Sequence, residues 1–441
     1  MTKVALHSLG CKVNAYETEA MAKMFEEHGY EIVPFREGAD IYIINTCTVT
    51  NIADRKSRQM LHKAKKMNQD ALVVAVGCYA QAFCDTLEKD EAIDIIVGND
   101  RKKDIVAIVE QRVNDVIDIN DTGVRHEFEE LKIDGMEEKT RTYIKIQDGC
   151  NQFCTYCIIP YARGRVRSRE LQNILSEVDR LIEKGYQEIV LTGIHLSSYG
   201  IDFRNEKGQG EQVRSVSLID VIKQIGGKKE IKRIRLGSLE PRIITREFLE
   251  ELKRVEAFCP HFHLSLQSGC DATLKRMNRR YTAEEYKEGC RLIREYFKEA
   301  AITTDVIVGF PGETQEEFEE CKKLLMEVNF AKMHIFKYSK REGTKAAVMA
   351  HQVEDSVKAA RSSQLLQLDE KLRRNYMEKF LNRRINVLFE ERIEIKGETF
   401  FVGHTREYLK VAVKTEENLA NRIIQVETRE LLNNEIILAI F

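Results

Sequence analysis

Three cysteines in one short segment have the residue types and spacing to bind a metal centre. Cys150, Cys154 and Cys157 follow the pattern C-x3-C-x2-C directly after an apolar segment that predicts a strand. Thiolates hold iron–sulfur clusters, and a 4Fe–4S cube needs four sites. Three ligands without a nearby fourth leave one iron open to another molecule. A structural zinc would want four ligands, normally two pairs, and three incidental buried cysteines are the remaining alternative.

Three further cysteines each follow a predicted strand in the first part of the chain. Cys11, Cys47 and Cys78 are separated by about 30 residues each. The loops after parallel strands open on one edge of an α/β sheet, so these sulfurs can converge on a second cluster. The alternative is that each is only a small buried apolar residue. Cys84 is a rival for the role of Cys78, but it follows a helical segment.

Composition limits the class of protein. The 441 residues favour about three domains, and 43% apolar residues suffice for real cores. The charges of the 69 basic and 71 acidic side chains nearly cancel, so an anionic partner would have to bind a local patch of basic residues. Eleven cysteines are too few for a disulfide scaffold of this length. With no apolar run of about 18 residues and no signal peptide, we expect a cytoplasmic protein without a membrane partner.

The first two regions both alternate strands with helices, which predicts an α/β fold. In residues 1–120 the pattern predicts an open parallel sheet, and the polar residues 121–140 predict a linker. The expected strands there are Val4–Leu6, Ile41–Ile44, Leu72–Val76 and Ile93–Val97, and the expected helices include Ala15–Glu27 and Asp54–Met67.

Residues 141–376 predict a partial parallel (βα) barrel, whose chemistry belongs at the carboxyl ends of its strands. A surface loop is expected at Asp202–Ser215 and a long helix at Glu354–Leu381. The six expected strands are Tyr143–Gln147, Glu188–Gly193, Arg233–Ser238, Phe262–Gln267, Thr303–Gly309 and Lys332–Tyr338. The expected helices between them are Leu171–Lys184, Ile244–Val255, Ala283–Phe297 and Gln315–Val328.

Residues 377–441 change to a period of two, which predicts a small all-β barrel. Its basic and acidic residues nearly balance, so composition does not mark it as an RNA binder. Phe400, Phe401 and Tyr408 are aromatic side chains on which bases can stack. Core packing is the better interpretation of these three residues.

The segment from Gly149 to Cys157 resembles the radical S-adenosylmethionine (SAM) superfamily. The resemblance implies that Cys150, Cys154 and Cys157 hold a 4Fe–4S cluster whose open iron binds the amino and carboxylate groups of SAM. One electron would then cleave SAM to a 5'-deoxyadenosyl radical. Tyr156 matches the aromatic position that packs near the adenine of SAM, although a core tyrosine is an equal alternative.

Polar and glycine residues at four other expected strand ends fit the same cofactor. Gly193 lets a ligand approach the backbone, and His195 can donate a hydrogen bond to it. A hydroxyl and a carboxylate at the next strand end suit the ribose hydroxyls or the ammonium group of SAM. Each feature alone is weak, because a glycine after a strand is usually a turn. The remaining residues expected to bind the cofactor are Ser238, Glu240, Gln267 and Asp305.

With the early cysteines and the β tail, the resemblance extends over nearly the whole chain to the methylthiotransferase family. It implies that Cys11, Cys47 and Cys78 hold an auxiliary 4Fe–4S cluster that carries sulfur, and that residues 377–441 form a TRAM-type RNA-binding barrel. Two SAM molecules per product, a low-potential electron donor, a sulfur source and the anticodon loop of a tRNA are also implied.

Two segments resemble one branch of that family. Gly149–Arg167 and Ser8–Glu17 are most similar to enzymes that modify carbon 2 of N6-threonylcarbamoyladenosine next to the anticodon. Relatives that act on isopentenyladenosine usually carry Asp-Lys where this chain has Asn151 and Gln152. Two alternative substrates are isopentenyladenosine and an aspartate of a ribosomal protein. A further alternative is a non-catalytic RNA-binding protein whose fold is stabilised by a metal.

Alternating arginines follow the cysteine segment and predict an RNA-binding patch. Arg163, Arg165, Arg167 and Arg169 would share one side of an extended segment, where phosphates of an anticodon loop could reach them. Ordinary solvated surface charge is the alternative. Other candidate patches are Lys275 and Arg276 with Arg279 and Arg280, and Arg55, Lys56 and Arg58.

Overall fold

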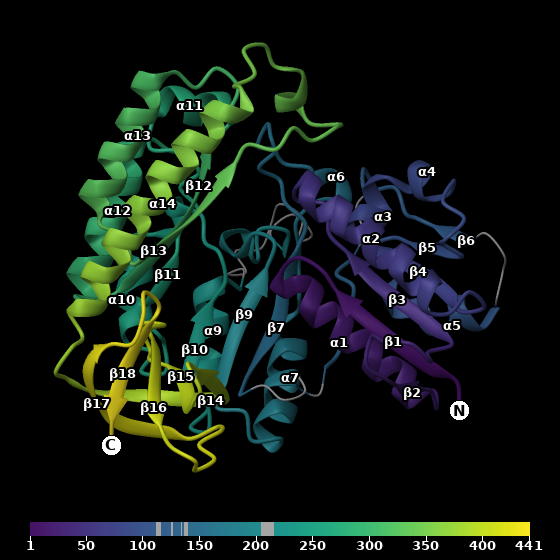
Figure 1. Ribbon diagram of the computed structural model, residues 1–441, viewed down its shortest axis with the longest axis horizontal. Helices are drawn as coiled ribbons and strands as arrows, with labels where there is room; N and C mark the ends of the chain where they lie inside the picture. Colours follow the sequence, from purple (N-terminus) through teal and green to yellow (C-terminus); the bar gives the residue numbers. More distant parts are fainter. Residues whose placement is uncertain (112–115, 125–126, 134, 136–139, 204–215) are drawn as a thin grey trace, which may run out of the picture.

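A computed structural model describes residues 1–111, 116–124, 127–133, 135, 140–203 and 216–441. Most of the surface loop expected at Asp202–Ser215 lies outside this part of the chain. An N-terminal α/β domain lies beside a central α/β domain, and a small C-terminal barrel lies under the central one (Figure 1). No helix in the described ranges has the length and apolarity that a membrane crossing requires.

The N-terminal domain is built on one parallel sheet, as predicted. Alternate residues of its strands face opposite layers, because successive side chains of a strand point to opposite faces. Val74 and Val76 pack against α1 and α5, whereas Val73 and Ala75 pack against α2. The strand order is β2 (Glu31–Ile32), β1 (Lys3–Ser8), β3 (Ile41–Thr46), β4 (Leu72–Gly77), β5 (Ile95–Val97) and β6 (Val116–Asp118). The helices are α1 (Lys12–Glu27), α2 (Asn51–Met67), α3 (Cys78–Ala82), α4 (Cys84–Leu87) and α5 (Ile105–Gln111).

The central domain is a partial parallel barrel, which confirms the predicted architecture. Two parallel sheets are joined by an isolated bridge between Leu239 and Leu264. The short strand β8 (Arg167–Ser168) pairs antiparallel with the first barrel strand. The six barrel strands are β7 (Arg141–Asp148), β9 (Glu188–Gly193), β10 (Arg233–Leu236), β11 (His261–His263), β12 (Ala301–Val308) and β13 (Lys332–Lys337).

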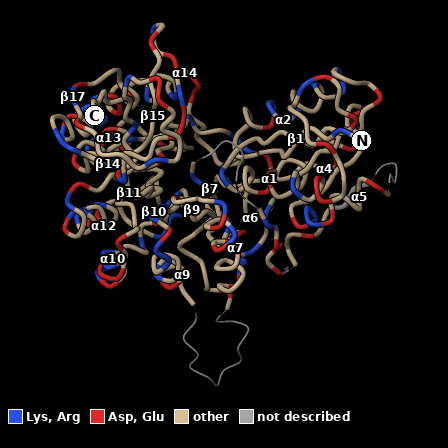
Figure 2. Tube along the Cα trace, turned by 90° about the horizontal axis from the view of Figure 1, so that it is seen from below, with Lys and Arg blue, Asp and Glu red and all other residues tan. Residues whose placement is uncertain are grey.

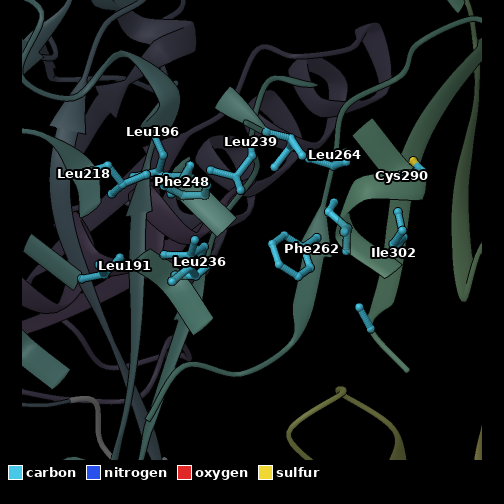
Figure 3. Close-up of a cluster of buried hydrophobic side chains, with 14 of the residues drawn as sticks. Leu191, Leu196, Leu218, Leu236, Leu239, Phe248, Phe262, Leu264, Cys290 and Ile302 are labelled. Atoms are coloured by element: carbon cyan, nitrogen blue, oxygen red, sulfur yellow. The ribbon is translucent and has the colours of Figure 1, made fainter. Parts of the chain in front are cut away.

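Helices cover the outer face of the barrel and bury its largest apolar core. Leu191, Leu236, Phe262 and Ile302 point from four strands into this core (Figure 3). Thr282 caps the start of α12 by a reciprocal pair of hydrogen bonds with Glu285. The helices are α6 (Ile159–Arg163), α7 (Leu171–Glu183), α9 (Leu218–Gly226), α10 (Arg246–Lys253), α11 (Asp271–Arg276), α12 (Ala283–Tyr296), α13 (Gln315–Val328) and α14 (Asp355–Glu378). Shorter 3-10 turns are η2 (Leu196–Ser198), η3 (Pro241–Ile243) and η4 (Lys345–Val348), and η1 (Lys102–Asp104) precedes α5 in the N-terminal domain.

The C-terminal domain is a closed all-β barrel, as predicted. Phe400 and Phe401 are 3% and 4% exposed, so they belong to its core and offer no surface for base stacking. Tyr408 is 37% exposed. The strand order around the barrel is β14 (Arg384–Ile395), β15 (Glu398–His404), β16 (Lys410–Lys414), β18 (Ile436–Ile440) and β17 (Ile423–Leu431).

The C-terminal barrel docks against the central barrel through two arginines. Arg233 Nη1 donates to the carbonyl oxygen of His404 over 2.7 Å, and Arg235 Nη1 donates to that of Arg406 over 2.8 Å. Both arginines lie on β10 and form ion pairs with Glu188, the first residue of β9. The amino ends of the barrel strands therefore face the C-terminal domain, and their carboxyl ends remain for the cysteine segment.

Candidate cluster and cofactor site

Cys11, Cys47 and Cys78 converge at the carboxyl edge of the N-terminal sheet. They follow β1, β3 and β4, three neighbouring strands. Gly10 has φ +99°, and a Cβ there would lie 2.6 Å from Cys47 Sγ, so the loop before Cys11 needs glycine to approach Cys47. Burial, and then the charges of the Cys78 and Cys11 thiols, raise the pKa of Cys47 to about 12. The three thiols thus lie close enough to affect one another's ionisation.

Cys150, Cys154 and Cys157 lie in the loop between β7 and α6. Gly149 has φ +69°, and a Cβ there would clash with the carbonyl oxygen of Arg165, so the loop folds tightly back on itself. Burial raises the pKa of Cys150 to about 11 and that of Cys157 to about 12, and the Cys154 thiol adds to both shifts. Three ionised thiols disfavour one another here, and a bound metal centre supplies the positive charge that they need.

Neither cysteine trio has the dimensions of a site for one metal ion. A tetrahedral zinc with Zn–S bonds of about 2.3 Å holds its sulfurs only about 3.8 Å apart. In the described ranges, the one metal-binding group whose ligand atoms all lie within 4.8 Å of one another is His263, Asp305 and His334. The wider spacing of both trios fits a polynuclear iron–sulfur cluster better than zinc.

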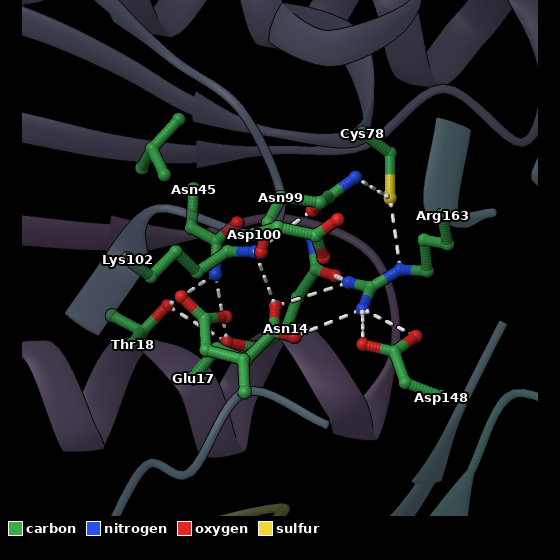
Figure 4. A network of polar contacts seen from close by, with 12 residues as sticks. Asn14, Glu17, Thr18, Asn45, Cys78, Asn99, Asp100, Lys102, Asp148 and Arg163 are labelled. Carbon is green, nitrogen blue, oxygen red and sulfur yellow. Dashed lines mark hydrogen bonds and ion pairs between the residues drawn. The ribbon is translucent and has the colours of Figure 1, made fainter. Parts of the chain in front are cut away.

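Arg163 connects the two trios. It is the last residue of α6, the short helix that follows the cysteine loop, and its side chain reaches Cys78 in the N-terminal domain. Its Nε donates to Cys78 Sγ over 3.2 Å, and its Nη1 contacts Glu17 at 2.8 Å and Asp148 at 3.1 Å. Lys145 pairs with the same two carboxylates at 2.7 and 2.6 Å. Figure 4 shows Glu17 and Cys78 of the N-terminal domain converging with Asp148 and Arg163 of the central domain.

This network locks the N-terminal domain onto the barrel. Arg163, Glu17 and Asp148 are at most 2% exposed. Burial alone would raise the pKa of both carboxyl groups, but the surrounding cations hold the pKa of Glu17 and of Asp148 well below the usual range. Removing one member would therefore leave buried charge unpaired.

The predicted arginine patch is wrong for three of its four members. Arg163, Arg167 and Arg169 are at most 4% exposed. Arg167 pairs with Asp100, and Arg169 pairs with a buried glutamate. The segment is not extended throughout, and the neutralising carboxylates come from elsewhere in the chain. Over the whole molecule basic and acidic residues are interspersed (Figure 2).

Arg165 is the exposed member of that series. Its guanidinium lies 4.6 Å from the centre of the Phe153 ring, in the cysteine loop. Of the other two basic groups, Arg276 pairs with Glu317, whereas Arg55 and Lys56 are exposed on α2.

His195 and Glu240 lie with the cysteine loop at the carboxyl ends of β9 and β10. His195 Nδ1 bonds to Ser198 Oγ at 2.6 Å, and its buried Nε2 has no partner in the described structure. Burial, and then the charge of Arg279, lower the pKa of His195 to about 4, so its imidazole is neutral at physiological pH. Glu240 lies near enough to Cys150 to affect its ionisation. An unpartnered ring nitrogen at this position suits a ligand with a polar group.

The other predicted cofactor residues are distributed over the same rim and the barrel wall. Gly193 packs so closely on Gln147 that a Cβ would lie 3.0 Å from three of its atoms. Tyr156 packs edge-on against Phe310 at 6.3 Å, and Ser238 is exposed. Gln267 adopts φ +69° and forms an isolated bridge to Val306 of β12.

Asp305 lies deeper than predicted, on the inner face of β12. Its Oδ2 contacts His263 Nε2 at 3.2 Å, and His263 Nδ1 contacts Thr303 Oγ1 at 2.9 Å. Asp305 therefore groups with His263 and His334 and not with His195 and Glu240.

Two arginines reach the surroundings of the cysteines only through the fold. Arg279 Nη1 donates to Cys154 Sγ over 3.2 Å. The 2% exposed Arg341 donates to Asp54 and Asn51 near the start of α2, beside the loop that carries Cys47. Basic runs in the sequence include Arg279, but only the fold brings it to a thiol.

Comparison with known proteins identifies relatives for nearly the whole chain. Residues 144–325 match the radical SAM superfamily, and residues 3–98 match uncharacterized protein family UPF0004. Threonylcarbamoyladenosine tRNA methylthiotransferase MtaB of Bacillus subtilis is 40% identical over 97% of this chain and 94% of the relative. The tRNA-2-methylthio-N(6)-dimethylallyladenosine synthase of Thermoanaerobacter sp. strain X514 is 34% identical over 96% and 90%.

Solved structures share the fold at low sequence identity. The radical SAM methyltransferase TsrM of Kitasatospora setae has a TM-score of 0.55 and 17% identity, and the match covers 79% of this chain and 75% of that one. The cobalamin-dependent radical SAM enzyme OxsB gives a TM-score of 0.51 at 12% identity, over 84% and 62%. These structures support the arrangement of an α/β domain beside a partial barrel.

Proposed function

The chain belongs to the radical SAM tRNA methylthiotransferase family, and from this premise we propose that it methylthiolates carbon 2 of N6-threonylcarbamoyladenosine next to the anticodon. The 40% identity to an enzyme named for that nucleoside, against 34% to one named for the dimethylallyl nucleoside, supports this choice.

One observation carries the proposal: two cysteine trios from different domains meet on either side of a single buried network. The loop that ends at Cys157 leads directly into α6, and the last residue of that helix, Arg163, contacts Cys78. A five-residue helix is only about 7 Å long, so the two trios are close neighbours. Sulfur transfer between a radical site and a second cluster requires such proximity.

The trios fit two 4Fe–4S clusters, one in each domain. Cys150, Cys154 and Cys157 would hold the cluster that binds SAM. The auxiliary cluster would be held by Cys11, Cys47 and Cys78. When bound, the clusters and two SAM molecules per product would supply the methyl group, the sulfur and the one-electron chemistry that breaks an aromatic C–H bond, which no side-chain acid or base can do.

The protein's own side chains position and polarise these groups. Arg279 holds the Cys154 sulfur in place by its hydrogen bond. His195 offers a neutral ring nitrogen, and Glu240 offers a carboxylate for the polar groups of SAM. Tyr156 presents an aromatic ring beside Phe310. Gly193, Ser238 and Gln267 lie along the same rim, and Asp305 lies on the inner wall below it.

The proposed reaction also needs a bound tRNA, an electron donor and a source of sulfur. Arg165, which lies over Phe153 beside the cysteine loop, is positioned to meet a phosphate of the anticodon loop. A low-potential electron donor and a source of sulfur for the auxiliary cluster would come from other molecules.

The test is mass spectrometry of tRNA nucleosides from a deletion strain. Loss of the methylthio group from threonylcarbamoyladenosine is the expected result. Loss from the isopentenyl nucleoside instead would assign the other tRNA substrate. An unchanged nucleoside profile would contradict both and favour a protein substrate such as a ribosomal-protein aspartate.

A second measurement separates the enzyme from a metal-stapled RNA-binding protein. Anaerobic reconstitution should give about eight iron atoms per chain, two cubes' worth, with reductive cleavage of SAM. Bound zinc without SAM turnover would contradict the enzymatic assignment.

A further inference from the structure

Four cationic side chains gather on the inner side of the barrel, near the amino ends of its strands. Arg141 lies on β7, and Arg233 and Arg235 lie on β10. The fourth, Lys12, is the first residue of α1 in the N-terminal domain and directly follows Cys11. The function proposed above gives none of the four cations a role.

Two tyrosine rings bring these cations together. Lys12 Nζ lies 5.9 Å from the centre of the Tyr143 ring, and the Arg141 side chain interacts with the hydroxyl of Tyr143. Arg141 and Arg235 lie 5.1 and 4.8 Å from the centre of the Tyr408 ring. Both Lys12 and Tyr408 are exposed. The cluster therefore combines side chains from all three domains and stays accessible to a ligand.

The two arginines of β10 already have partners. Glu188 pairs with Arg235 at 2.7 Å and with Arg233 at 3.5 Å. The same arginines also donate to carbonyl oxygens of the C-terminal barrel, and both are 2% exposed. They are committed to the domain interface, but they add positive potential to the space beside them.

Lys12 and Arg141 are the accessible pair. Arg141 has a side chain 16% exposed and shares Glu390 with His404. No carboxylate in the described part of the chain forms an ion pair with Lys12. The cluster therefore holds four cations against the two carboxylates Glu188 and Glu390, and this excess of positive charge favours binding of a further anion.

We propose that Lys12 and Arg141 bind the carboxylate of the threonyl group on the modified adenosine. This inference rests on the function proposed above. A threonylcarbamoyl substituent carries a free carboxylate, whereas a dimethylallyl substituent is uncharged and apolar. The carboxylate would reduce the excess of positive charge, and its position next to Cys11 would keep the base beside the thiols that are proposed to carry sulfur.

The same cations would also reject the wrong nucleoside. An apolar substituent would displace water from Lys12 and Arg141 without replacing its hydrogen bonds, and a polar site left unpaired in this way discriminates strongly. The charge on the substituent, and not its size, thus decides between the two tRNA substrates.

The experiment compares two anticodon stem–loop RNAs, one with N6-threonylcarbamoyladenosine and one with its carboxamide, which has the same shape but no charge. We expect the reconstituted enzyme to bind the carboxylate form about 10- to 100-fold more tightly, the range for a hydrogen bond to a charged group. The readout is the dissociation constant from fluorescence anisotropy, with kcat/KM for methylthiolation measured beside it.

The variant Lys12→Met removes the charge, and Lys12→Arg retains it. We expect Lys12→Met to reduce the preference for the carboxylate RNA over the carboxamide RNA to less than about threefold, because the interaction between the ligand's charge and the Lys12 ammonium is lost. Lys12→Arg should keep most of the preference. Lys298→Met removes an exposed lysine at the end of α12 and should leave the preference at the wild-type value.

The outcomes separate this inference from the function itself. If the wild-type enzyme modifies the threonylcarbamoyl RNA and binds its carboxamide equally well, the carboxylate site is disproved and the function stands. If it modifies only dimethylallyl RNA, the proposed function fails. If Lys12→Met weakens the carboxylate, carboxamide and unmodified RNAs by the same factor, Lys12 binds a backbone phosphate and the inference is also overturned.

Discussion

The two cysteine trios differ in what holds them together. Cys150, Cys154 and Cys157 lie within eight consecutive residues of one loop. The ligands of the proposed auxiliary cluster come from three loops spread between residues 11 and 78, and they meet because β1, β3 and β4 are neighbours in a parallel sheet. One trio depends on local chain geometry, whereas the other depends on a folded domain.

This difference extends to their surroundings. The loop trio, which is Cys150, Cys154 and Cys157, receives its main cationic contact from Arg279 of the same domain. The sheet trio, which is Cys11, Cys47 and Cys78, receives a contact from Arg163 of the neighbouring domain, and the same network holds the two domains together. We therefore expect changes at the domain interface to affect the sheet trio much more than the loop trio.

The largest expected effect comes from Cys154→Ala. Loss of one ligand of the loop trio should abolish SAM cleavage and product formation together, since both need that cluster. Iron should fall from about eight to about four atoms per chain. Cys84→Ala, outside both trios, should retain full iron. Cleavage of SAM by the Cys154→Ala variant, measured as 5'-deoxyadenosine, would contradict the assignment.

The variant Cys47→Ala tests the sheet trio in the same way. We expect the variant to keep SAM cleavage but to form no methylthiolated nucleoside, because the loop trio is intact and the sheet trio is not. Iron should again be about four atoms per chain. Mass spectrometry of the treated RNA gives the answer. Methylthiolated product from this variant would remove the auxiliary-cluster assignment.

Arg163→Met tests the dependence on the domain interface. It leaves Glu17 and Asp148 buried with less positive charge, so we expect a loss of about 3–5 kcal/mol in the free energy of unfolding. Arg165→Met, two residues away and exposed, should change stability by less than about 0.5 kcal/mol. Urea unfolding compares the two.

The same pair of variants sharpens the comparison of the trios. Arg163→Met should lower the iron held by the sheet trio while SAM cleavage by the loop trio persists. Equal loss of both clusters would show that the network supports the whole molecule and not one trio.

The smallest expected effect concerns His195, which belongs to the surroundings of the loop trio. Its folded-state pKa of about 4 lies below the ordinary value of 6.5, so the unfolded chain takes up a proton first as the pH falls. Stability is therefore full above pH 6.5 and falls as the pH drops towards 4, by at most about 3 kcal/mol.

His195→Gln should remove this part of the pH dependence and leave the iron of the sheet trio unchanged. Urea unfolding at pH 7 and pH 5, for both proteins, is the measurement. An equal loss of stability between the two pH values in wild type and variant would contradict a buried neutral imidazole at this position.

The repeating patterns of the sequence predicted the architecture well. Strand and helix periods located the parallel sheet, the partial barrel and the closed barrel. The strand β17 is not evident in the sequence because its polar residues, such as Glu427 and Arg429, dominate the pattern, and only Val426 and Thr428 are buried. The strand expected at Phe262–Gln267 is shorter, since β11 ends at His263.

The arginine patch failed because charge in a sequence does not reveal burial. Arg163 ends a helix instead of lying in an extended segment, and its partner Glu17 lies 146 residues earlier. Likewise, Lys12 has no distinguishing pattern, and only the assembled domains place it beside Arg141. Long-range pairing of this kind is a property of the fold and not of local spacing.

The docking of the C-terminal barrel has a consequence for how the chain can be divided. Arg233 and Arg235 direct donors to backbone oxygens of that barrel, and their one shared carboxylate is Glu188. A chain cut after α14 would leave both guanidinium groups facing water at the amino ends of the barrel strands, with Tyr408 gone. The small barrel thus covers the amino ends of the central barrel strands, and its removal would expose buried charge of the central domain to water.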